Sequence, residues 1–343
     1  RRKSFNVENI NKKLKERNAV TMSWRRKWRF LHVALLVVVL LTAGCGGAAS
    51  NSQPEQQPAP AENGASTSAF PLTITDASGA EIHLEKAPER LVSLAPSNTE
   101  NAFALGLGSK VVGVTDWDNY PEEVKEIEKI GGLEPNIEKI LSLEPDLVIA
   151  HVSANNKSIQ PLRDAGLKVL ALPDSKNFDG VYEALRMLGK ATGTQDKAEE
   201  VIQQMEQKKA AITAKVADLS EQEKVKVWVE VSPDLYTAGR GTFIDDLIRL
   251  AGGINVAAEE EGWVQLSEEQ VIAAQPDVII TTYGGYETEK PSEQIRARKA
   301  WADLPAVKEN RIYDLNSDLV SRPGPRLVEG LEQVAKCLYP ERF

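Results

Sequence analysis

The chain of 343 residues is long enough for one large domain or two lobes, and its 42% hydrophobic and 27% charged residues are typical of a soluble globular protein. Its net charge of −9 is spread unevenly: residues 1–44 hold 11 of the 41 basic and 2 of the 50 acidic residues, so the remainder carries a net charge of −18. Such an acidic body argues against binding to nucleic acid and against adsorption to anionic lipid. The two cysteines, Cys45 and Cys337, lie far apart, and we expect Cys337 to be buried in a helix rather than in a disulfide.

The N-terminal region has the proportions of a secretion signal. After Met22, the first methionine, a basic cluster at residues 25–29 precedes an apolar stretch at residues 30–41, which is short for a membrane span. Small residues then precede Cys45 in the sequence LTAGC, which resembles the lipobox of bacterial lipoproteins, whose cysteine is lipidated after cleavage. We therefore interpret residues 1–44 as an upstream extension followed by a lipoprotein signal peptide. The alternative is an uncleaved anchor helix.

Residues 45–69 are predicted to tether a folded body to a membrane. Durable anchoring requires two or more acyl chains, which a lipobox Cys45 would supply. The following residues are rich in Pro, Gln, Ser and Ala, and this composition buries too little apolar surface to offset the entropy lost on ordering. We expect a disordered tether that holds the body at the extracytoplasmic face of a bacterial cell membrane.

Residues 70–176 alternate between short strand and helix patterns, and we assign them to an N-terminal lobe. Strand patterns at Leu72–Thr75 and Glu81–Leu84 flank a DASG turn and predict a hairpin. Four later strand patterns, in RLVSLAP, KVVGVT, PDLVIAH and LKVLAL, are separated by helical patterns, the first of which we expect Ser97 or Asn98 to cap. This alternation predicts a parallel sheet with helices on both faces.

Residues 177–222 are predicted to form a helical connector. Phe178–Lys190 has a helical pattern, and Gln195–Leu219 carries apolar residues near a 3.6-residue period. A helix over that second segment would span about 37 Å at 1.5 Å per residue, which favours a strut between two lobes over an ordinary surface helix.

Residues 223–343 repeat the pattern of the first lobe and form a predicted C-terminal lobe. The stretch NIEKILSLEPDLVIA aligns with LSEEQVIAAQPDVIIT at an offset of 131 residues, which puts Glu138 on Glu269 and one Pro-Asp pair on another. Pro-Asp is a common breaker, but matching strand–Pro–helix–Gly units support two similar lobes. The predicted fold class is α/β, with two Rossmann-like lobes of mostly parallel sheet joined by one long helix.

The sequence lacks the usual signatures of catalysis and metal binding. It contains no G-x-S-x-G, no H-E-x-x-H, no P-loop and no G-x-G-x-x-G after a strand. His32 falls in the signal segment, and His83 and His151 are too scattered to supply the imidazoles of a transition-metal site. We expect no catalytic residue, metal or cofactor, although the many carboxylates leave acid–base chemistry open.

Aromatic residues gather just after predicted strands in both halves. In parallel α/β sheets the C-terminal ends of the strands form the ligand crevice. One such aromatic is as easily a packing residue, but several predict a cleft with flat apolar walls, which suits a large rigid ligand better than a naked ion or a sugar. The residues concerned are Trp117, Tyr120, Tyr236, Trp263, Tyr283 and Tyr286.

The body from about residue 70 to residue 343 resembles the substrate-binding lipoproteins of ABC importers for vitamin B12 and ferric siderophores, the class III periplasmic binding proteins. The motifs that carry the resemblance are SNTE, YPEE, IEKILSLEPDLVI, SEEQVIAAQPDVII and SDLVSRPGPRLVEGL. The resemblance implies two Rossmann-like lobes joined by a helix, a shallow cleft with little hinge closure, and an ABC permease with its ATPase subunits as partners.

The resemblance also implies ligand-binding residues. Vitamin B12 members have an aromatic at Trp117 and an acidic residue near Asp318, whereas two more of their cleft aromatics fall on Gly132 and His151 here. Siderophore members use Arg and Tyr against anionic, oxygen-rich complexes. The predicted ligand-binding residues are Trp117, Tyr120, His151, Tyr236, Arg240, Trp263, Tyr283, Asp318 and Arg322.

Family members also meet arginines of the permease with one glutamate on each lobe. Glu138 matches the first, and its plain alternative is a solvated helix carboxylate. The second would fall on Ile254, and we expect Glu259 to substitute for it, with Glu260 and Glu261 as alternatives. Such charges at a rim mainly set the rate and orientation of encounter.

We predict a monomeric, membrane-tethered receptor that binds a corrinoid such as cobalamin, or a ferric siderophore, and delivers it to an ABC permease without making or breaking a bond. The first alternative is a siderophore receptor rather than a cobalamin receptor. From other classes, the alternatives are a cell-surface enzyme that acts on a similar ligand and a sensory or structural lipoprotein without a permease.

Overall fold

The computed structural model describes residues 70–343 apart from residues 133 and 286. These residues belong to one compact unit, which spans residues 66–343. The predicted signal peptide, Cys45, the tether at 45–69 and Tyr286 lie outside the described residues. None of the described helices combines the length and the apolar character that crossing a membrane requires.

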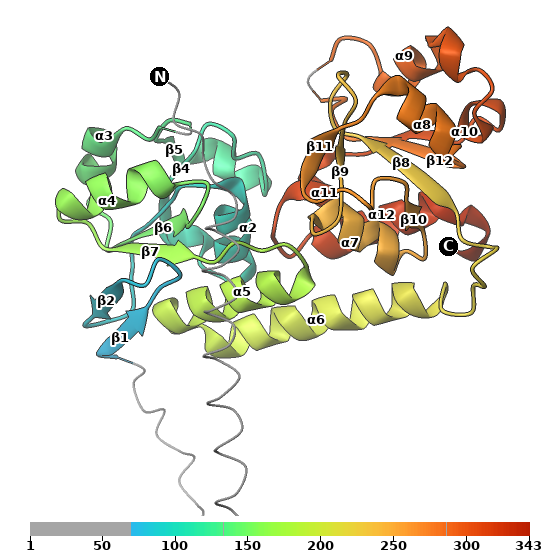
Figure 1. Cartoon of the computed structure of the whole chain (residues 1–343). Coiled ribbons are helices and arrows are strands. Elements are labelled where there is room, and N and C mark those ends of the chain that lie inside the picture. The colour runs from blue at the N-terminus through green and yellow to red at the C-terminus, as the bar shows by residue number, and fades with distance from the viewer. Residues whose placement is uncertain (1–69, 133, 286) are drawn as a thin grey trace, which may run out of the picture. The chain divides into compact units, whose positions relative to one another are not determined.

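The N-terminal lobe is built on a five-stranded parallel sheet (Figure 1). Its strands β6 and β7 read LVIAH and VLAL, and such nearly continuous apolar runs suit strands buried on both faces. In spatial order the strands are β5 (Glu128–Lys129), β4 (Val111–Val114), β3 (Leu91–Ser93), β6 (Leu147–His151) and β7 (Val169–Leu172). The connecting helices are α2 (Pro96–Ala104), η1 (Gly108–Lys110), η2 (Glu122–Glu126), α3 (Ile137–Ser142) and α4 (Asn156–Asp164).

A two-stranded antiparallel hairpin precedes this sheet, and its strands β1 (Leu72–Thr75) and β2 (Glu81–Leu84) confirm the predicted bounds. The predicted cap of the first helix is wrong. Helix α2 starts at Pro96, two or three residues earlier than expected, and Ala95 is its N-cap residue without a side-chain bond. Proline is pre-organised for the first helical position, so it sets the start of the helix and leaves Ser97 and Asn98 inside it.

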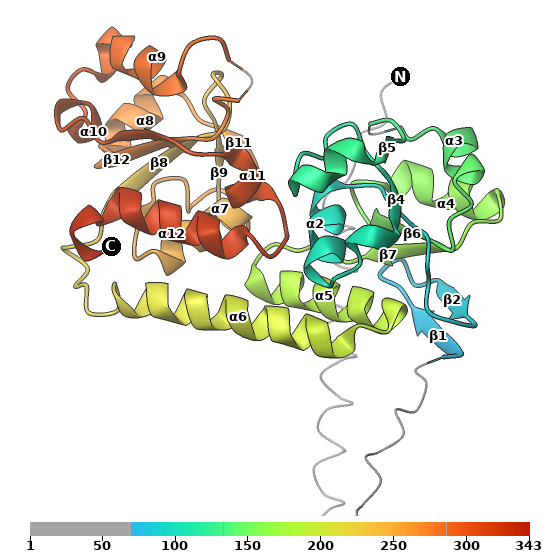
Figure 2. The same cartoon turned by 180° about the vertical axis from the view of Figure 1, so that it is seen from behind.

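The connector consists of two helices, α5 (Phe178–Thr192) and α6 (Gln195–Ala214). Gly193 has φ of 73°, the left-handed conformation that ends α5 and reverses the chain. Helix α6 packs on α5 and on α12 (Leu327–Leu338) of the other lobe, and it runs along both lobes (Figures 1 and 2). The helix ends at Ala214 rather than at Leu219 and is therefore about 30 Å long.

The C-terminal lobe holds a four-stranded parallel sheet and a separate antiparallel pair. The sheet has the spatial order β10 (Ile254–Asn255), β8 (Lys226–Glu230), β12 (Val278–Thr281) and β13 (Ile312–Asp314). The antiparallel pair is β9 (Tyr236–Ala238) with β11 (Trp263–Gln265). The remaining helices are α7 (Phe243–Leu250), α8 (Glu268–Ala274), α9 (Pro291–Ala297), η3 (Lys299–Trp301), α10 (Pro305–Lys308), α11 (Ser317–Ser321) and η4 (Pro340–Arg342).

The predicted repeat at an offset of 131 residues is visible in the backbone. Glu144 and Gln275, one offset apart, both have positive φ, of 47° and 49°, at the end of α3 and α8 respectively. Two residues later, Asp146 accepts hydrogen bonds from the backbone N–H groups just before β3, and Asp277 accepts one from the first residue of β8. Each carboxylate thus fixes the start of the neighbouring strand, and the two lobes share this joint.

Candidate functional site

A hollow of about 440 Å³ lies between the two lobes. Its lining comes from loops that follow strands β3, β4, β8, β12 and β13, together with β11 of the antiparallel pair. The lining residues are Pro96, Ser97, Trp117, Val231, Trp263, Thr282, Tyr283, Ser317, Asp318, Ser321, Arg322 and Pro323.

The topology explains why the hollow lies there. In the N-terminal sheet β3 lies between β4 and β6, and in the C-terminal sheet β8 lies between β10 and β12, so the strand order reverses at β3 and at β8. Ligand crevices of open α/β sheets form outside the carboxyl ends of strands at such reversals. The hollow therefore lies where two such crevices face each other.

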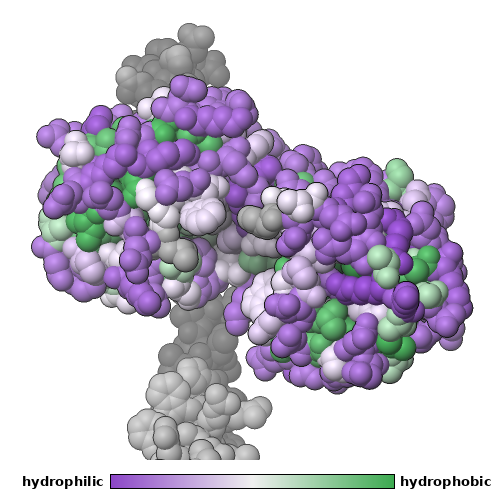
Figure 3. Space-filling view, turned by 90° about the horizontal axis from the view of Figure 1, so that it is seen from above, coloured by the Kyte–Doolittle hydropathy of each residue, from purple (hydrophilic) through white to green (hydrophobic). Residues whose placement is uncertain are grey.

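The walls of the hollow are two tryptophans from opposite lobes. Trp117 follows β4 and Trp263 lies on β11, and their side chains remain 57% and 54% exposed. Large apolar side chains this exposed are unusual unless they meet another molecule. A Cβ at Gly132 would lie 3.0 Å from the Trp117 Nε1 atom, so the glycine makes room for this indole. Seen from above, hydrophilic residues dominate both lobes, and residues of intermediate hydropathy flank the junction between them (Figure 3).

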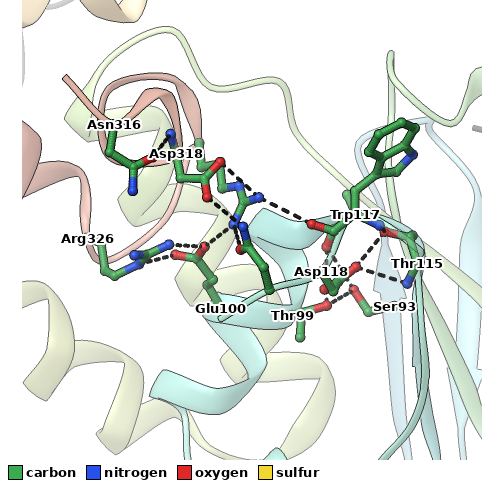
Figure 4. A network of polar contacts seen from close by, with 12 residues as sticks. Ser93, Thr99, Glu100, Thr115, Trp117, Asp118, Asn316, Asp318 and Arg326 are labelled. Carbon is green, nitrogen blue, oxygen red and sulfur yellow. Dashed lines mark hydrogen bonds and ion pairs between the residues drawn. The ribbon is translucent and has the colours of Figure 1, made fainter. Parts of the chain in front are cut away.

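Trp117 is presented by a tight turn whose centre is Asp118. The Asp118 carboxylate accepts hydrogen bonds from the backbone N–H and the hydroxyl of Thr115, at 2.9 and 2.5 Å. Only 5% of Asp118 is exposed, and this burial raises the pKa of its carboxyl. These hydrogen bonds hold the turn in place, and the indole of Trp117 points away from them (Figure 4).

Beneath the hollow, a buried carboxylate links the lobes. Glu100 on α2 is 3% exposed and accepts one hydrogen bond from Arg322, at 3.0 Å, and two from Arg326, at 2.9 and 2.6 Å (Figure 4). Both arginines belong to the C-terminal lobe. Arg326 also stacks on Tyr120, with its guanidinium carbon 3.8 Å from the ring centroid. Charge-assisted, forked contacts of this kind fix geometry as well as charge.

Asp318 and Asn119 extend this contact to the edge of the hollow. Asp318 pairs with Arg322 at 3.0 Å and accepts a hydrogen bond from the Asn119 amide at 2.9 Å, and Arg322 donates to the Asn119 carbonyl at 2.7 Å. The charges of Asp318 and Arg322, both predicted to bind ligand, therefore compensate each other. A second hollow of about 550 Å³ shares the Ser317 and Asp318 wall.

Tyr283 is held at the hollow by a buried network of the C-terminal lobe. Its hydroxyl donates to Glu230 at 2.7 Å, and Arg298 meets the same carboxylate with two bonds of 2.7 Å. Glu230 has no exposed surface, and Trp228 donates to its second oxygen. Burial, and next the bond to Glu230, raise the pKa of Tyr283. Tyr283 therefore offers the hollow a ring face rather than a phenolate.

Of the nine predicted ligand residues, the structure brings five together around the hollow. These are Trp117, Trp263, Tyr283, Asp318 and Arg322. Four others do not line it. Tyr120 turns toward a different hollow, of about 350 Å³, between α2, α6 and α12. Tyr120 thus lies three residues from Trp117 in the sequence but lines a different hollow.

The remaining three residues lie outside the lining for separate reasons. His151 ends β6 with its Nδ1 atom 3.0 Å from Asp174, and burial lowers the pKa of its imidazole. Tyr236 lies on β9 opposite Gln265 and is 44% exposed; it shares a face of the β9–β11 pair with Trp263 but does not itself line the hollow. Arg240 follows β9 and its side chain is exposed.

Several residues at or beneath the hollow were not predicted from the sequence, among them Ser97, Glu100, Thr282 and Arg326. One signal for Glu100 was available. The run SNTEN at the start of α2 is polar yet buried throughout, which breaks the amphipathic pattern of a surface helix. Among residues 70–343 with their two gaps, no three His, Cys, Asp or Glu side chains gather as a metal site would require.

The proposed docking carboxylates lie on exposed positions. Glu138 lies in the first turn of α3, behind the N-cap Asn136, and Glu269 holds the same place in α8, behind the N-cap Ser267. Glu259 is also exposed, but it lies in the loop after β10 rather than at the start of a helix.

These features define a two-lobed α/β protein with a hollow between lobes joined by α5 and α6, the architecture of a binding protein. The comparisons agree with this class: the chain belongs to the periplasmic binding protein family, which residues 91–319 match. The predicted fold class is confirmed, and so is the expectation that the protein is not an enzyme, because its relatives are binding proteins.

Two relatives are similar over most of the chain. The uncharacterized ABC transporter substrate-binding lipoprotein YvrC of Bacillus subtilis is 42% identical over 90% of this chain and 96% of its own length. A cobalamin-binding protein of Halobacterium salinarum is 32% identical over 90% of this chain and 83% of its own. The protein is thus an ABC transporter substrate-binding protein of the vitamin B12, siderophore and heme type.

Two solved structures also match. The vitamin B12-binding protein BtuF of Vibrio cholerae is 30% identical, with a TM-score of 0.63 over 74% of this chain and 98% of that one. The heme-binding protein RhuT from Roseiflexus sp. RS-1 is 32% identical, with a TM-score of 0.67 over 74% of this chain and 99% of that one.

Proposed function

We propose that the protein is a lipid-anchored receptor that binds a corrinoid in the inter-lobe hollow and delivers it to an ABC permease. The observation that carries the proposal is the pair of half-exposed indoles, Trp117 and Trp263, which face one hollow from opposite lobes. Covering the exposed part of each ring is worth about 2–3 kcal/mol at 25 cal/mol per Å². Flat, rigid ligands gain most from such walls.

The charges of the hollow favour a corrinoid over a ferric siderophore. An anionic, oxygen-rich complex would need unpaired cations, yet Arg322 is already bound to Glu100 and Asp318, and Arg240 lies outside the lining. A corrinoid carries mostly neutral carboxamide arms and needs no such cation. Relatives named as cobalamin-binding and vitamin B12-binding proteins, at 31–32% identity, support the same choice.

Heme is the other flat macrocycle among the neighbours. Heme iron is commonly held by a His, Cys, Met or Tyr side chain. Of the described lining residues only Tyr283 belongs to these types, and its hydroxyl is committed to Glu230. The hollow therefore suits a macrocycle bound by its faces and edges rather than through its metal.

Anchoring through Cys45 is part of the proposal. The similarity to the lipoprotein YvrC covers 90% of the chain, more than residues 70–343 supply, so it extends into the region that contains Cys45. Replacement of Cys45 by serine should abolish incorporation of labelled palmitate and release the protein from the membrane fraction. Retention of both in the Cys45→Ser variant would contradict lipid anchoring at this residue.

For docking to the permease we propose Glu138 and Glu269 in place of Glu138 and Glu259. The first pair occupies equivalent turns of the two lobes, as a two-fold arrangement of permease subunits would require. Charge reversal at Glu138 or Glu269 should reduce capture of the protein by its permease and leave ligand binding unchanged. Glu259→Arg is the matched control, and equal loss in that variant would restore the original assignment.

The ligand is tested by titration calorimetry of the purified chain with cyanocobalamin, ferrichrome and haemin. We expect cyanocobalamin alone to bind with high affinity, and Trp117→Ala and Trp263→Ala each to weaken it about 10- to 100-fold. Leu141→Ala, which truncates an exposed apolar side chain of α3 outside the lining, is the control and should bind as the parent does. Preference for ferrichrome or haemin would reject the corrinoid.

A further inference from the structure

Two hydroxyl residues at the hollow come from opposite lobes and lack a partner. Ser97, the second residue of α2, and Thr282, just after β12, are each only 6% exposed, and both line the hollow. Within the described part of the chain, neither hydroxyl makes a hydrogen bond, and neither belongs to the side-chain atoms that are fully buried without a partner. Both hydroxyls are therefore accessible from the hollow and free to bond a molecule that fills it.

Hydroxyl residues one or two positions away in the sequence do form hydrogen bonds. Thr99 donates to Ser93 at 2.8 Å, and Thr281 donates to the Asp314 carboxylate at 2.6 Å. Near both positions, hydroxyl groups that point into the protein therefore have hydrogen-bond partners. The two that reach the hollow are left for another molecule.

The start of α2 gives the Ser97 side of the hollow a donor character. The Ala95 carbonyl accepts from the N–H groups of Asn98 and Thr99, and Pro96 has no N–H, so the N–H of Ser97 is the first-turn donor without a partner among the described residues. The positive end of the helix dipole reinforces this character. Arg322, the cation in the described lining, is paired with Glu100 and Asp318, so the site favours a neutral acceptor over an anion.

We propose that Ser97 and Thr282 form a two-sided polar floor that selects a ligand edged with carboxamides. Ser97 donates its N–H and O–H to amide carbonyl oxygens, and the Thr282 hydroxyl, with a free acceptor lone pair, receives an amide N–H or donates to a second carbonyl. The assignment rests on the proposed corrinoid function and names the part of the ligand that determines specificity: the amide periphery of the macrocycle.

The test compares the full-length parent with Ser97→Ala, Thr282→Val and the double variant, titrated with dicyanocobinamide and dicyanocobyrinic acid. The first compound has an amide edge and the second a carboxylate edge. We expect each single variant to bind dicyanocobinamide about 3- to 10-fold more weakly, as the loss of one hydrogen bond implies. In the double variant the preference for the amide compound should shrink by the product of both factors.

Stability separates this role from a structural one. Removal of a hydroxyl that has no partner in the protein should leave the thermal midpoint of the ligand-free protein unchanged. Thr281→Val is the matched control, because it removes a satisfied hydroxyl one residue away and should lower the midpoint while the affinity remains that of the parent. Loss of stability in Ser97→Ala and Thr282→Val as in the control would overturn the inference.

The outcomes also distinguish the two proposals. Parent-like affinity in both variants, alongside weakened binding in Trp117→Ala, would overturn the polar floor and leave the corrinoid receptor intact. Absence of any corrinoid binding by the parent would overturn both.

Discussion

Replacement of Glu100 by glutamine should weaken the contact between the two lobes and lower the free energy of unfolding. The substitution keeps the shape of the side chain and removes the charge that receives three hydrogen bonds from Arg322 and Arg326. Loss of one partner from a buried ion pair costs about 3–5 kcal/mol, because the remaining charge stays buried without compensation. Both arginine side chains keep 15% exposure and glutamine retains one acceptor, so we expect the lower end, about 3 kcal/mol.

The assay is urea unfolding of the purified chain, followed by circular dichroism, with Glu332→Gln as the matched control. Glu332 pairs with Lys336 on the surface of α12, where both side chains are about half exposed. An exposed pair of this kind is worth about 0–1 kcal/mol, so the control should unfold close to the parent. If Glu100→Gln also lies within 1 kcal/mol of the parent, the network does not hold the lobes together and the reasoning fails.

Three further variants or conditions test the fold. Gly330→Ala should be strongly destabilising because its Cβ would collide with the backbone carbonyl of Leu319, whereas Gly285→Ala, with nothing nearby, should be neutral in the same thermal melt. Burial lowers the pKa of His151 below 6.5, so the unfolded chain binds the proton before the folded chain does as pH falls. The free energy of unfolding should therefore decrease below about pH 6.5, and the decrease should be smaller in His151→Asn. Urea unfolding at pH 7.5 and 5.0 measures both. Burial raises the pKa of Cys337 to about 12, so mass spectrometry should find its peptide unalkylated by iodoacetamide until urea unfolds the chain.

Local patterns in the sequence were sufficient for most of the fold. The strands β6 and β7 are apolar runs that only a doubly covered strand can bury, and the DASG turn marks the hairpin. The end of α6 was missed because the apolar period continues to Val216 and Leu219, which pack against the body after the helix has ended. A period of apolar residues indicates which side chains are buried, and buried side chains such as Val216 can also lie outside a helix.

The candidate site could be predicted only in part. Trp117 follows the end of β4, and topology brings strand ends together, so local sequence sufficed for this wall. Trp263 begins β11 of the antiparallel pair instead of following a strand, and the sequence pattern did not show that pairing. The contact between Glu100 and Arg326 joins residues 226 positions apart, and no pattern along the chain reports such a pairing. Ser97 was taken for a cap because its type suits one, whereas Pro96 determines where the helix starts.

The double attachment of the lobes, through α6 on one side and through Glu100 on the other, bears on how a transporter would recognise its cargo. A receptor braced at two points has little freedom to change its outline when it fills. Ligand-free and ligand-bound receptors would then present the same exposed glutamates, Glu138 and Glu269, and compete for the permease. The permease could then distinguish the two forms only by contacting the bound ligand at the opening of the hollow. Excess ligand-free receptor would therefore slow uptake.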